Sequence, residues 1–169
     1  MLSQLYENYK NMDKITLERI KTAHPKIKDE LNVYYSECNN KLPKGVRLRF
    51  SHVYRSPKEQ DALFNQKPKV TNAKGWQSIH NYGLAFDYVI LIDKDNNGTF
   101  ESIDWNVGNE YHKIVISYFK SKGYEWGGDW KFKDTPHFQK AFGFDWKTLK
   151  ARVDKGITIS EGGIIYPKI

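Results

Sequence analysis

Two histidines and one aspartate are the residues of this chain best suited to hold a metal ion. Asp87 lies within the apolar run LAFDYVILI (residues 84–92), His80 lies seven residues earlier, and His137 ends the segment DTPH (residues 134–137). A buried carboxylate is costly unless a cation or an arginine compensates its charge, so Asp87 needs a partner. Two imidazoles and a carboxylate that leave one position for water are a catalytic zinc ligand set. The residues therefore predict a hydrolytic zinc centre at His80, Asp87 and His137.

The chain between His80 and Asp87 must fold back for both side chains to reach one ion. Fully extended, it would separate them by roughly 23 Å, whereas two ligands of one zinc ion lie about 3 Å apart. Gly83 lies between them and supplies the backbone freedom for this reversal. Asp134, three residues before His137, is placed to act as a base on a water molecule at the metal.

The remaining histidines carry weaker signals. His24 and His112 are expected to be ordinary hydrogen-bonded polar residues, because that is what most isolated histidines are. His52 lies near the end of a predicted strand, and the sequence leaves its role open.

Local patterns predict the elements that position these residues. The segment SPKE (residues 56–59) is a capping box with proline at the first helical position. Val46, Leu48 and Phe50 alternate with polar residues, as in a half-buried strand. The sequence also predicts a helix opened by Pro25, a long loop over 65–83 and a strand buried on both faces over 84–92. A turn-rich insert is expected over 93–106, followed by a helix over 111–119 closed by Gly123. Short strands and loops are expected over 124–143, and a last helix from Trp146 to about Val153 capped by Asp145.

These elements mix helices and strands without a βαβ rhythm. They predict an α+β fold with a small, mainly antiparallel sheet and flanking helices. A length of 169 residues, with 39% apolar and 28% charged residues, suits one soluble globular domain, expected to span residues 1–169 as a monomer. Aromatic residues make up 15%, and they serve either as core rings or as the lining of a groove for a polar polymer.

The charge and the chain terminus bear on partners and location. The net charge of +7 favours anionic polymers, either nucleic acid or bacterial cell wall. No nucleic-acid partner is expected, because the lysines are scattered and such binding leaves Asp87 without a role. The single cysteine, Cys38, is expected in the core. The N-terminal sequence has no apolar run, so we expect synthesis in the cytoplasm without a signal peptide or membrane insertion, and action on the wall after release by a holin-type pore or lysis.

Several motifs together resemble one enzyme family. SIHNYGLAFD (residues 78–87) matches the S-x-H-x-x-G-x-A-x-D motif of the LAS metallopeptidases, which include D-alanyl-D-alanine carboxypeptidases and dipeptidases. WGGDW (126–130) and DTPHF (134–138) are similar to the branch of L-alanyl-D-glutamate endopeptidases of phage endolysins and bacterial autolysins. YRS (54–56) and the C-terminal IIYPKI (164–169) also resemble that branch. The resemblance runs from about residue 20 to the C-terminus.

The resemblance implies a hedgehog/DD-peptidase-like fold, one bound Zn²⁺, and cleavage of the peptidoglycan stem peptide, at the L-Ala–D-Glu bond. Asp134 would be the general base, taking a proton from the attacking water and passing it to the leaving amine. Arg55 would point into the site from a strand end and stabilise the oxyanion. Substrate contacts or orientation of neighbouring groups are expected from Ser78, Gln60, Trp126 and Asp129.

Two other functions stay open at this point. A D-Ala-D-Ala carboxypeptidase would use the same zinc site and differ in the shape of its cleft. A non-catalytic wall-binding module would also use the positive charge and the tryptophans, although a complete ligand set with Asp134 argues against it.

A second metal site is possible in the insert. DKDNNG (residues 93–98) begins like an EF-hand calcium loop, whose ligands would be Asp93, Asp95, Asn97 and Asp104, with Glu101 at the ninth position. However, a strand precedes it instead of a helix, and Asn-Gly is a strong hairpin-turn signal. The segment is therefore either a Ca²⁺ site or a polar turn.

Overall fold

The computed structural model describes residues 12–169, so most of the N-terminal sequence on which the signal-peptide prediction rests lies outside it. The α-helices are α2 (Lys14–Ile20), α3 (Pro25–Asn39), α4 (Pro57–Asn65), α5 (Glu110–Ser121) and α6 (Trp146–Asp154), with short 3-10 helices η1 (Ile79–Tyr82) and η2 (Gly127–Asp129). The strands are β1 (Val46–His52), β2 (Ala85–Ile92), β3 (Ser102–Asp104), β4 (Glu125–Trp126), β5 (His137–Gln139), β6 (Thr158–Glu161) and β7 (Ile164–Pro167).

Strand β2 is the centre of the main sheet. It pairs with β1 along one edge; along the other, its first residues pair with β5 and its last residues pair with β3. Strand β4 continues the sheet beyond β5, and every pairing is antiparallel. The prediction of an α+β fold with a small, mainly antiparallel sheet is therefore confirmed.

The two-residue period of the strands separates the core from the site. Phe86 in β2 and Phe138 in β5 point to the face covered by α3 and α5, where both are fully buried. Successive strand residues point to opposite faces. Asp87 and His137 therefore lie together on the other face of the sheet, as a direct result of strand alternation.

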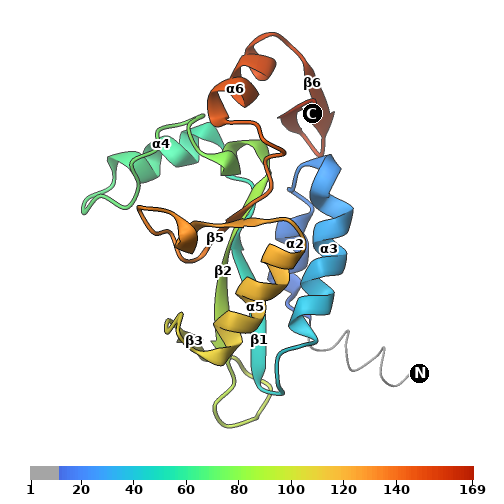
Figure 1. The fold of residues 1–169 in the computed structure, drawn as a ribbon, viewed down its shortest axis with the longest axis vertical. Helices are drawn as coiled ribbons and strands as arrows, with labels where there is room; N and C mark the ends of the chain where they lie inside the picture. The colour runs from blue at the N-terminus through green and yellow to red at the C-terminus, as the bar shows by residue number, and fades with distance from the viewer. Residues whose placement is uncertain (1–11) are drawn as a thin grey trace.

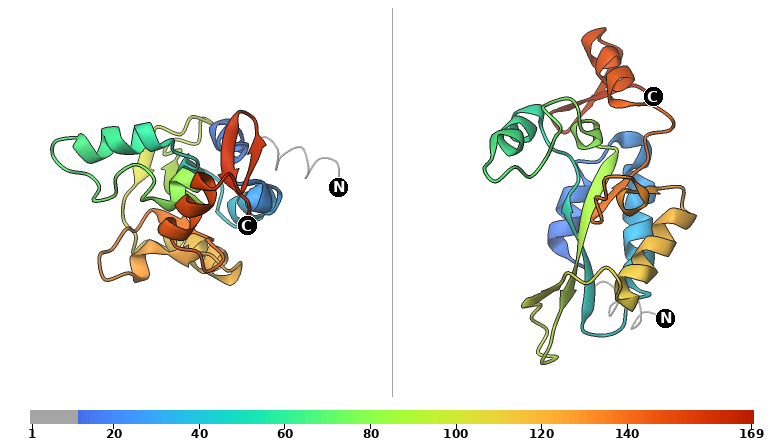
Figure 2. Two further views of the ribbon diagram at one scale, coloured as in Figure 1. Left: turned by 90° about the horizontal axis from the view of Figure 1, so that it is seen from above. Right: turned by 60° about the vertical axis from the view of Figure 1, so that its left-hand side comes forward.

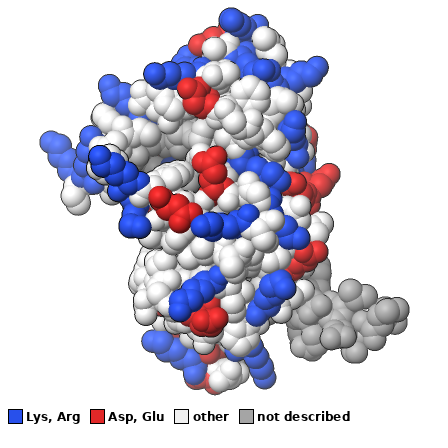
Figure 3. Space-filling model, viewed as in Figure 1, with Lys and Arg blue, Asp and Glu red and all other residues white. Residues whose placement is uncertain are grey.

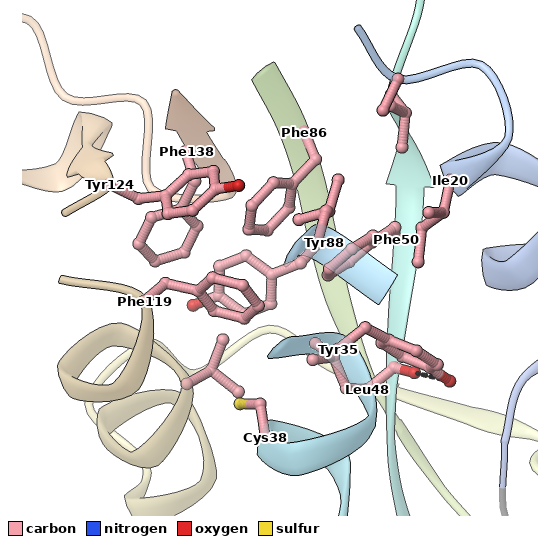
Figure 4. Packing of buried hydrophobic residues seen from close by; sticks show 14 of the residues in the cluster. Ile20, Tyr35, Cys38, Leu48, Phe50, Phe86, Tyr88, Phe119, Tyr124 and Phe138 are labelled. Carbon is pink, nitrogen blue, oxygen red and sulfur yellow. Dashed lines mark hydrogen bonds between the residues drawn. The ribbon is translucent and has the colours of Figure 1, made fainter. Parts of the chain in front are cut away.

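The core is built largely from aromatic rings. Phe86 stacks on Phe50 and Phe138 with ring centroids 4.2 and 5.2 Å apart, and Phe119 of α5 meets Phe86 edge-on at 4.8 Å (Figure 4). Such pairs add stability beyond the area that they bury. Cys38 is fully buried among them, as predicted, and burial raises the pKa of its thiol to about 12. Many of the aromatic residues thus serve the core.

Side chains of α2 and α3 cover the outer edge of β1. The backbone N–H of Phe50 donates to Thr16 Oγ1 at 2.9 Å, and that of Leu48 donates to Asn39 Oδ1 at 2.9 Å. Free N–H groups on an edge strand invite pairing with other chains. These contacts close the outer edge of β1. The site lies on the face of the sheet opposite α3 and α5.

The elements around the site project from the sheet. Helix α4 extends to one side, away from α2 and α3, while α6 and the β6–β7 hairpin lie at one end of the molecule (Figures 1 and 2). Figure 3 shows a hollow between α4 and the β4–β5 segment, with Lys and Arg side chains around it. No helix within residues 12–169 is long and apolar enough to span a bilayer.

Most predicted elements are confirmed, including the capping box of Ser56 with Glu59, the αL residue Gly123 and the cap of Asp145 on the last helix. Three predictions need correction. The loop over 65–83 contains η1, and the insert over 93–106 contains β3. The strand over 84–92 is not buried throughout, because Asp87 and Val89 are only half-buried on the site face.

Candidate active site

Two strands, β2 and β5, and the short helix η1 bring the predicted metal ligands together. His52, Asp87 and His137 are register partners across β1, β2 and β5 and form one row on the sheet. His80 comes from η1, just before β2. Gly83 ends that helix with φ +67°, and a Cβ there would lie 2.7 Å from the backbone nitrogen of His24. The reversal predicted between His80 and Asp87 therefore depends on glycine at this position.

The three candidate ligand atoms lie close to one another. His80 Nε2 is 3.0 Å from Asp87 Oδ1 and 3.1 Å from His137 Nδ1, and His137 Nδ1 is 3.2 Å from Asp87 Oδ1. Two atoms bound to the same zinc ion are separated by about this distance. Both histidines are buried, and Asp87 is 17% exposed toward the cleft.

Hydrogen bonds on the outer sides of the two rings determine which nitrogens face the centre. His80 Nδ1 lies 2.7 Å from the carbonyl oxygen of Val53, which can only accept, so Nδ1 carries the proton. His137 Nε2 lies 3.1 Å from Gln139 Oε1 and donates to it in the same way. Neutral rings then direct two nitrogen lone pairs and one carboxylate oxygen at one point. Three acceptors without a shared proton fit a divalent cation such as zinc, held by outer hydrogen bonds as in known sites.

The electrostatics agree with a site built for positive charge. Burial disfavours the ionised form of Asp87, but the charges and hydrogen bonds of His80 and His137 outweigh it and hold the pKa of Asp87 well below its usual range. Burial also lowers the pKa of His137, but hydrogen bonding to Asp87 and its charge raise it above the usual value. A carboxylate that attracts protons onto its neighbours will also attract a metal cation.

Arg55 lies beside the ligand group, where the sequence placed it. Its Nη2 donates to Asp87 Oδ2 at 3.3 Å and its Nη1 donates to Gln60 Oε1 at 3.0 Å. Only 12% of the Arg55 side chain is exposed. Each terminal nitrogen has a second N–H group, so the guanidinium keeps donors for a ligand while its plane is held.

Asp134 borders the same cleft of about 730 Å³ as His80, Asp87 and His137. Desolvation by the surrounding protein raises the pKa of Asp134, and the negative charge of Asp87 raises it further against the opposing effect of His137. As a whole residue Asp134 is exposed at the cleft wall, although the surrounding protein partly desolvates its carboxylate. A carboxylate with a raised pKa in a cleft is suited to accept a proton from a bound water molecule.

The residues expected to contact substrate separate into two groups. Ser78 borders the cleft and caps η1 through its hydroxyl, which accepts from the backbone of His80. Gln60 is completely buried and donates to the carbonyl oxygen of Ala73, so its place is behind Arg55, in the orienting role and not in contact with substrate.

Trp126 and Asp129 lie outside the residues that border the cleft. The indole N–H of Trp126 donates to the carbonyl oxygen of Thr135 at 2.8 Å and so supports the segment that carries Asp134. The Asp129 carboxylate accepts from Lys120 Nζ at 2.6 Å on the outer surface. The expectation that these two residues bind substrate therefore finds no support in their positions.

The calcium-loop ligands do not assemble as the sequence suggested. Asp93, Asp95 and Glu101 have carboxylate oxygens within 4.8 Å of one another. Asp104, the expected twelfth position, is absent from that group and instead accepts from Asn106 and Asn109 before α5. Asp93 accepts from the backbone of Asn97 and Gly98. The segment forms a polar turn between the paired strands β2 and β3, held by these backbone hydrogen bonds, and Asp104 takes no part in the acidic group.

The structure places His52, whose role the sequence left open, beside the cleft, and it adds two residues that the sequence did not single out. His52 borders the cleft with Nδ1 3.9 Å from Asp87 Oδ2, and Trp130 packs on the His137 ring with centroids 5.2 Å apart. Gln139 is a hydrogen-bond partner of His137, two residues away on the same strand face. That i, i+2 spacing was a usable signal once the strand was assigned. His24 and His112, as predicted, are hydrogen-bonded: His24 to Pro167, and His112 to Tyr88 and to the backbone of Asp104.

Comparisons with known proteins agree with this geometry. A peptidase family M15 model described as D-alanyl-D-alanine carboxypeptidase matches residues 71–140, the part that contains all three candidate ligands. The peptidoglycan L-alanyl-D-glutamate endopeptidase CwlK of Bacillus subtilis (strain 168) is 40% identical over 129 residues, which are 69% of this chain and 72% of that protein.

Two further relatives extend the comparison. The L-alanyl-D-glutamate peptidase of Listeria phage A118 is 30% identical over 140 residues, covering 80% of this chain but only 42% of the phage protein. The crystal structure of the L-Ala D-Glu endopeptidase ChiX of Serratia marcescens superposes with a TM-score of 0.53 at 24% identity, over 78% of this chain and 90% of that one. At that identity the superposition supports the shared fold alone.

Proposed function

This chain belongs to peptidase family M15, and we propose that it is a zinc-dependent endopeptidase that hydrolyses the L-Ala–D-Glu bond in the stem peptide of peptidoglycan. One observation carries the proposal: three metal-binding atoms converge in an open cleft that also holds Asp134 and Arg55. The names of the bacterial and phage relatives support the choice of bond. The positive charge of the chain suits an anionic wall.

His80 Nε2, Asp87 Oδ1 and His137 Nδ1 would hold the zinc ion. When bound, zinc supplies a Lewis acid that polarises the scissile carbonyl and lowers the pKa of water. Asp134 accepts a proton from the attacking water molecule while the oxygen of that water bonds to the carbonyl carbon. When the C–N bond breaks, Asp134 passes that proton to the nitrogen of D-Glu, which leaves as a free amine. The products are a new carboxylate on L-Ala and a new amino terminus on D-Glu.

Arg55 stabilises the oxyanion of the tetrahedral intermediate. Its guanidinium is held by Asp87 and Gln60 before substrate arrives, so its remaining N–H groups need no reorganisation during reaction. Preorganised donors of this kind are often the largest contribution to lowering a barrier. Trp130 and Ser78 line the cleft, and we expect both to contact the peptide.

Mass spectrometry of digested purified cell walls tests the proposal. The expected result is muropeptides with new N-terminal D-Glu, formed by the wild-type protein and abolished by a chelator. Release of free D-Ala would instead identify a D-Ala-D-Ala carboxypeptidase, the function named in the description of the matching family model. Wall binding with no cleavage in the presence of zinc would identify a non-catalytic binding module.

A further inference from the structure

A row of polar side chains leads from His137 to the edge of the sheet. Gln139 follows His137 by two residues in β5, so both point to the cleft face. Glu125 in β4 is the cross-strand partner of Gln139. His137 Nε2 lies 3.1 Å from Gln139 Oε1, and Gln139 Nε2 donates to Glu125 Oε2 at 3.1 Å. His137 is thus connected through one amide to an exposed acid.

This row has a defined hydrogen-bond direction. An ionised carboxylate can only accept, so the NH₂ group of Gln139 must face Glu125. The amide oxygen of Gln139 then faces His137 Nε2 and can only accept from it. This contact favours the proton on Nε2 of the neutral His137 ring, whereas Asp87 Oδ1, 3.2 Å from Nδ1, competes for a proton on the other nitrogen until a cation takes its place.

We propose that Glu125 and Gln139 are positioning residues that fix His137 in the tautomer able to bind a metal ion through Nδ1, an inference that rests on the proposed zinc site. The two histidines are controlled differently. The backbone carbonyl of Val53 fixes His80, and no side-chain substitution reverses a backbone carbonyl. A rotatable amide contacts the outer nitrogen of His137, and the contact of that amide with Glu125 favours the orientation that presents its oxygen to the ring.

The position of Glu125 makes the inference testable without disturbing the core. Glu125 is exposed on the short strand β4, so its replacement removes no buried contact. Lysine at this position can only donate, and the Gln139 amide must then rotate to present its oxygen to the ammonium group. Its NH₂ group would face His137 Nε2, which must accept, so the proton would move to Nδ1 and block the ligand lone pair.

Zinc affinity of the purified protein, measured by competition with a chelator, is the first readout. Glu125→Lys is expected to weaken zinc binding by about 10- to 100-fold, the usual effect of losing an outer partner of a metal-binding histidine. Glu125→Gln keeps an acceptor and should stay close to wild type. Asp129→Lys makes the same change of charge on the outer surface, so it should also stay close to wild type. In Glu125→Lys/Gln139→Glu, the new carboxylate accepts from both neighbours, and most of the lost affinity should return.

The second readout is the nitrogen NMR spectrum of His137 in metal-free protein at a pH where the ring is neutral. Because Asp87 competes for a proton on Nδ1, the expected result is a larger fraction of the Nε2–H tautomer in wild type than in Glu125→Lys, with an unchanged thermal unfolding midpoint. Equal tautomer fractions in the two proteins, or a loss of affinity no greater than that of Asp129→Lys, would overturn the inference while leaving the zinc site intact. If wild type itself binds no zinc, the proposed function fails instead.

Discussion

The backbone of Asp134 packs directly against Gly127. The N–H of Asp134 donates to the carbonyl oxygen of Gly127 at 3.0 Å, and a Cβ on Gly127 would lie 2.3 Å from the carbonyl oxygen of Asp134. The indole N–H of the neighbouring Trp126 donates to the carbonyl oxygen of Thr135, the residue after Asp134. The position of the candidate base therefore depends on a residue that never enters the cleft.

Gly127→Ala should displace Asp134 and lower kcat by at least about tenfold, because a misplaced general base loses much of its contribution of about 10²- to 10⁴-fold. Zinc content must be measured on the same variant, because the carbonyl oxygen of Asp134 also accepts from the backbone N–H of His137 at 3.1 Å, and the loss in kcat is expected at full zinc occupancy. Steady-state hydrolysis of a soluble stem peptide, with zinc analysis of the same sample, measures both. Gly108→Ala is the matched control, because Gly108 is outside the cleft and has an ordinary backbone conformation. Full activity of Gly127→Ala would show that the contact does not position the base.

Asp134→Ala should retain one equivalent of zinc and lose about 10²- to 10⁴-fold in kcat, the range for a general base. Asp129→Ala serves as the control, because Asp129 is an acid of the same region whose carboxylate faces outward toward Lys120. Retention of full activity in Asp134→Ala would remove Asp134 from the mechanism.

The ionisation of Asp134 should control activity at low pH. The base form is the ionised carboxylate, so activity is present above the pKa of this group and is lost as pH falls through it. Desolvation raises that pKa in the metal-free protein, so NMR titration of the Asp134 carboxyl without metal should give a value above the ordinary aspartate range. A bound cation favours the ionised form, so the acid limb of kcat/KM at constant zinc saturation should lie below the metal-free value. A metal-free value at or below the ordinary one would contradict the assignment.

His137→Ala should lose the zinc ion, because it removes one of three protein ligands. His52→Ala should keep a full equivalent, because His52 is in the same row but outside the group of three converging atoms. Metal analysis after dialysis distinguishes the two variants. A full equivalent of zinc in His137→Ala would refute this ligand assignment.

Asp13 should contribute stability far from the site. Its carboxylate accepts from Arg49 Nη2 at 2.8 Å and Nε at 3.0 Å and from the hydroxyl of Thr16 at 2.7 Å. Asp13→Asn leaves the Arg49 charge without its partner and should lower the free energy of unfolding by about 3 kcal/mol, at the lower end of the range for buried pairs because Arg49 is 29% exposed. Urea unfolding monitored by tryptophan fluorescence measures it.

The same pair should show a defined pH dependence. Burial would raise the pKa of Asp13, but the hydrogen bonds from Arg49 and Thr16 lower it below the ordinary value. A depressed pKa gives stability that is present above the unfolded-state pKa and lost as pH falls through the folded-state pKa. The difference between wild type and Asp13→Asn should therefore shrink in acid, and a difference that is constant with pH would contradict the assignment.

Some elements escaped prediction for identifiable reasons. Helix α2 has only seven residues, and a helix that short is marginal without tertiary contacts. Its N-cap is Asp13, whose carboxylate accepts from Arg49, and its Thr16 accepts from Phe50, so both tertiary contacts come from far along the chain. The β6–β7 hairpin, by contrast, has a local signal, because Gly162-Gly163 separates two short runs of strand-forming residues.

The sequence by itself determined the local elements and the chemistry of the site. The helix start at Ser56 and the return of the chain at Gly83 follow from interactions within a few residues. His80, Asp87 and His137 could be selected because a charged residue in an apolar strand needs a partner. The strand period then dictated that Asp87 and Phe86 face opposite sides.

Only the tertiary structure decided how those groups are oriented. That His137 presents Nδ1, and His80 Nε2, depends on the carbonyl of Val53 and on the register that places Glu125 opposite Gln139. The burial of Gln60 behind Arg55 and the separation of Asp104 from Asp93 likewise depend on which segments pack together. Proton positions and ligand geometry depend on differences smaller than the width of one side chain. Contacts between segments distant in the sequence determine these differences, so no local spacing in the chain encodes them.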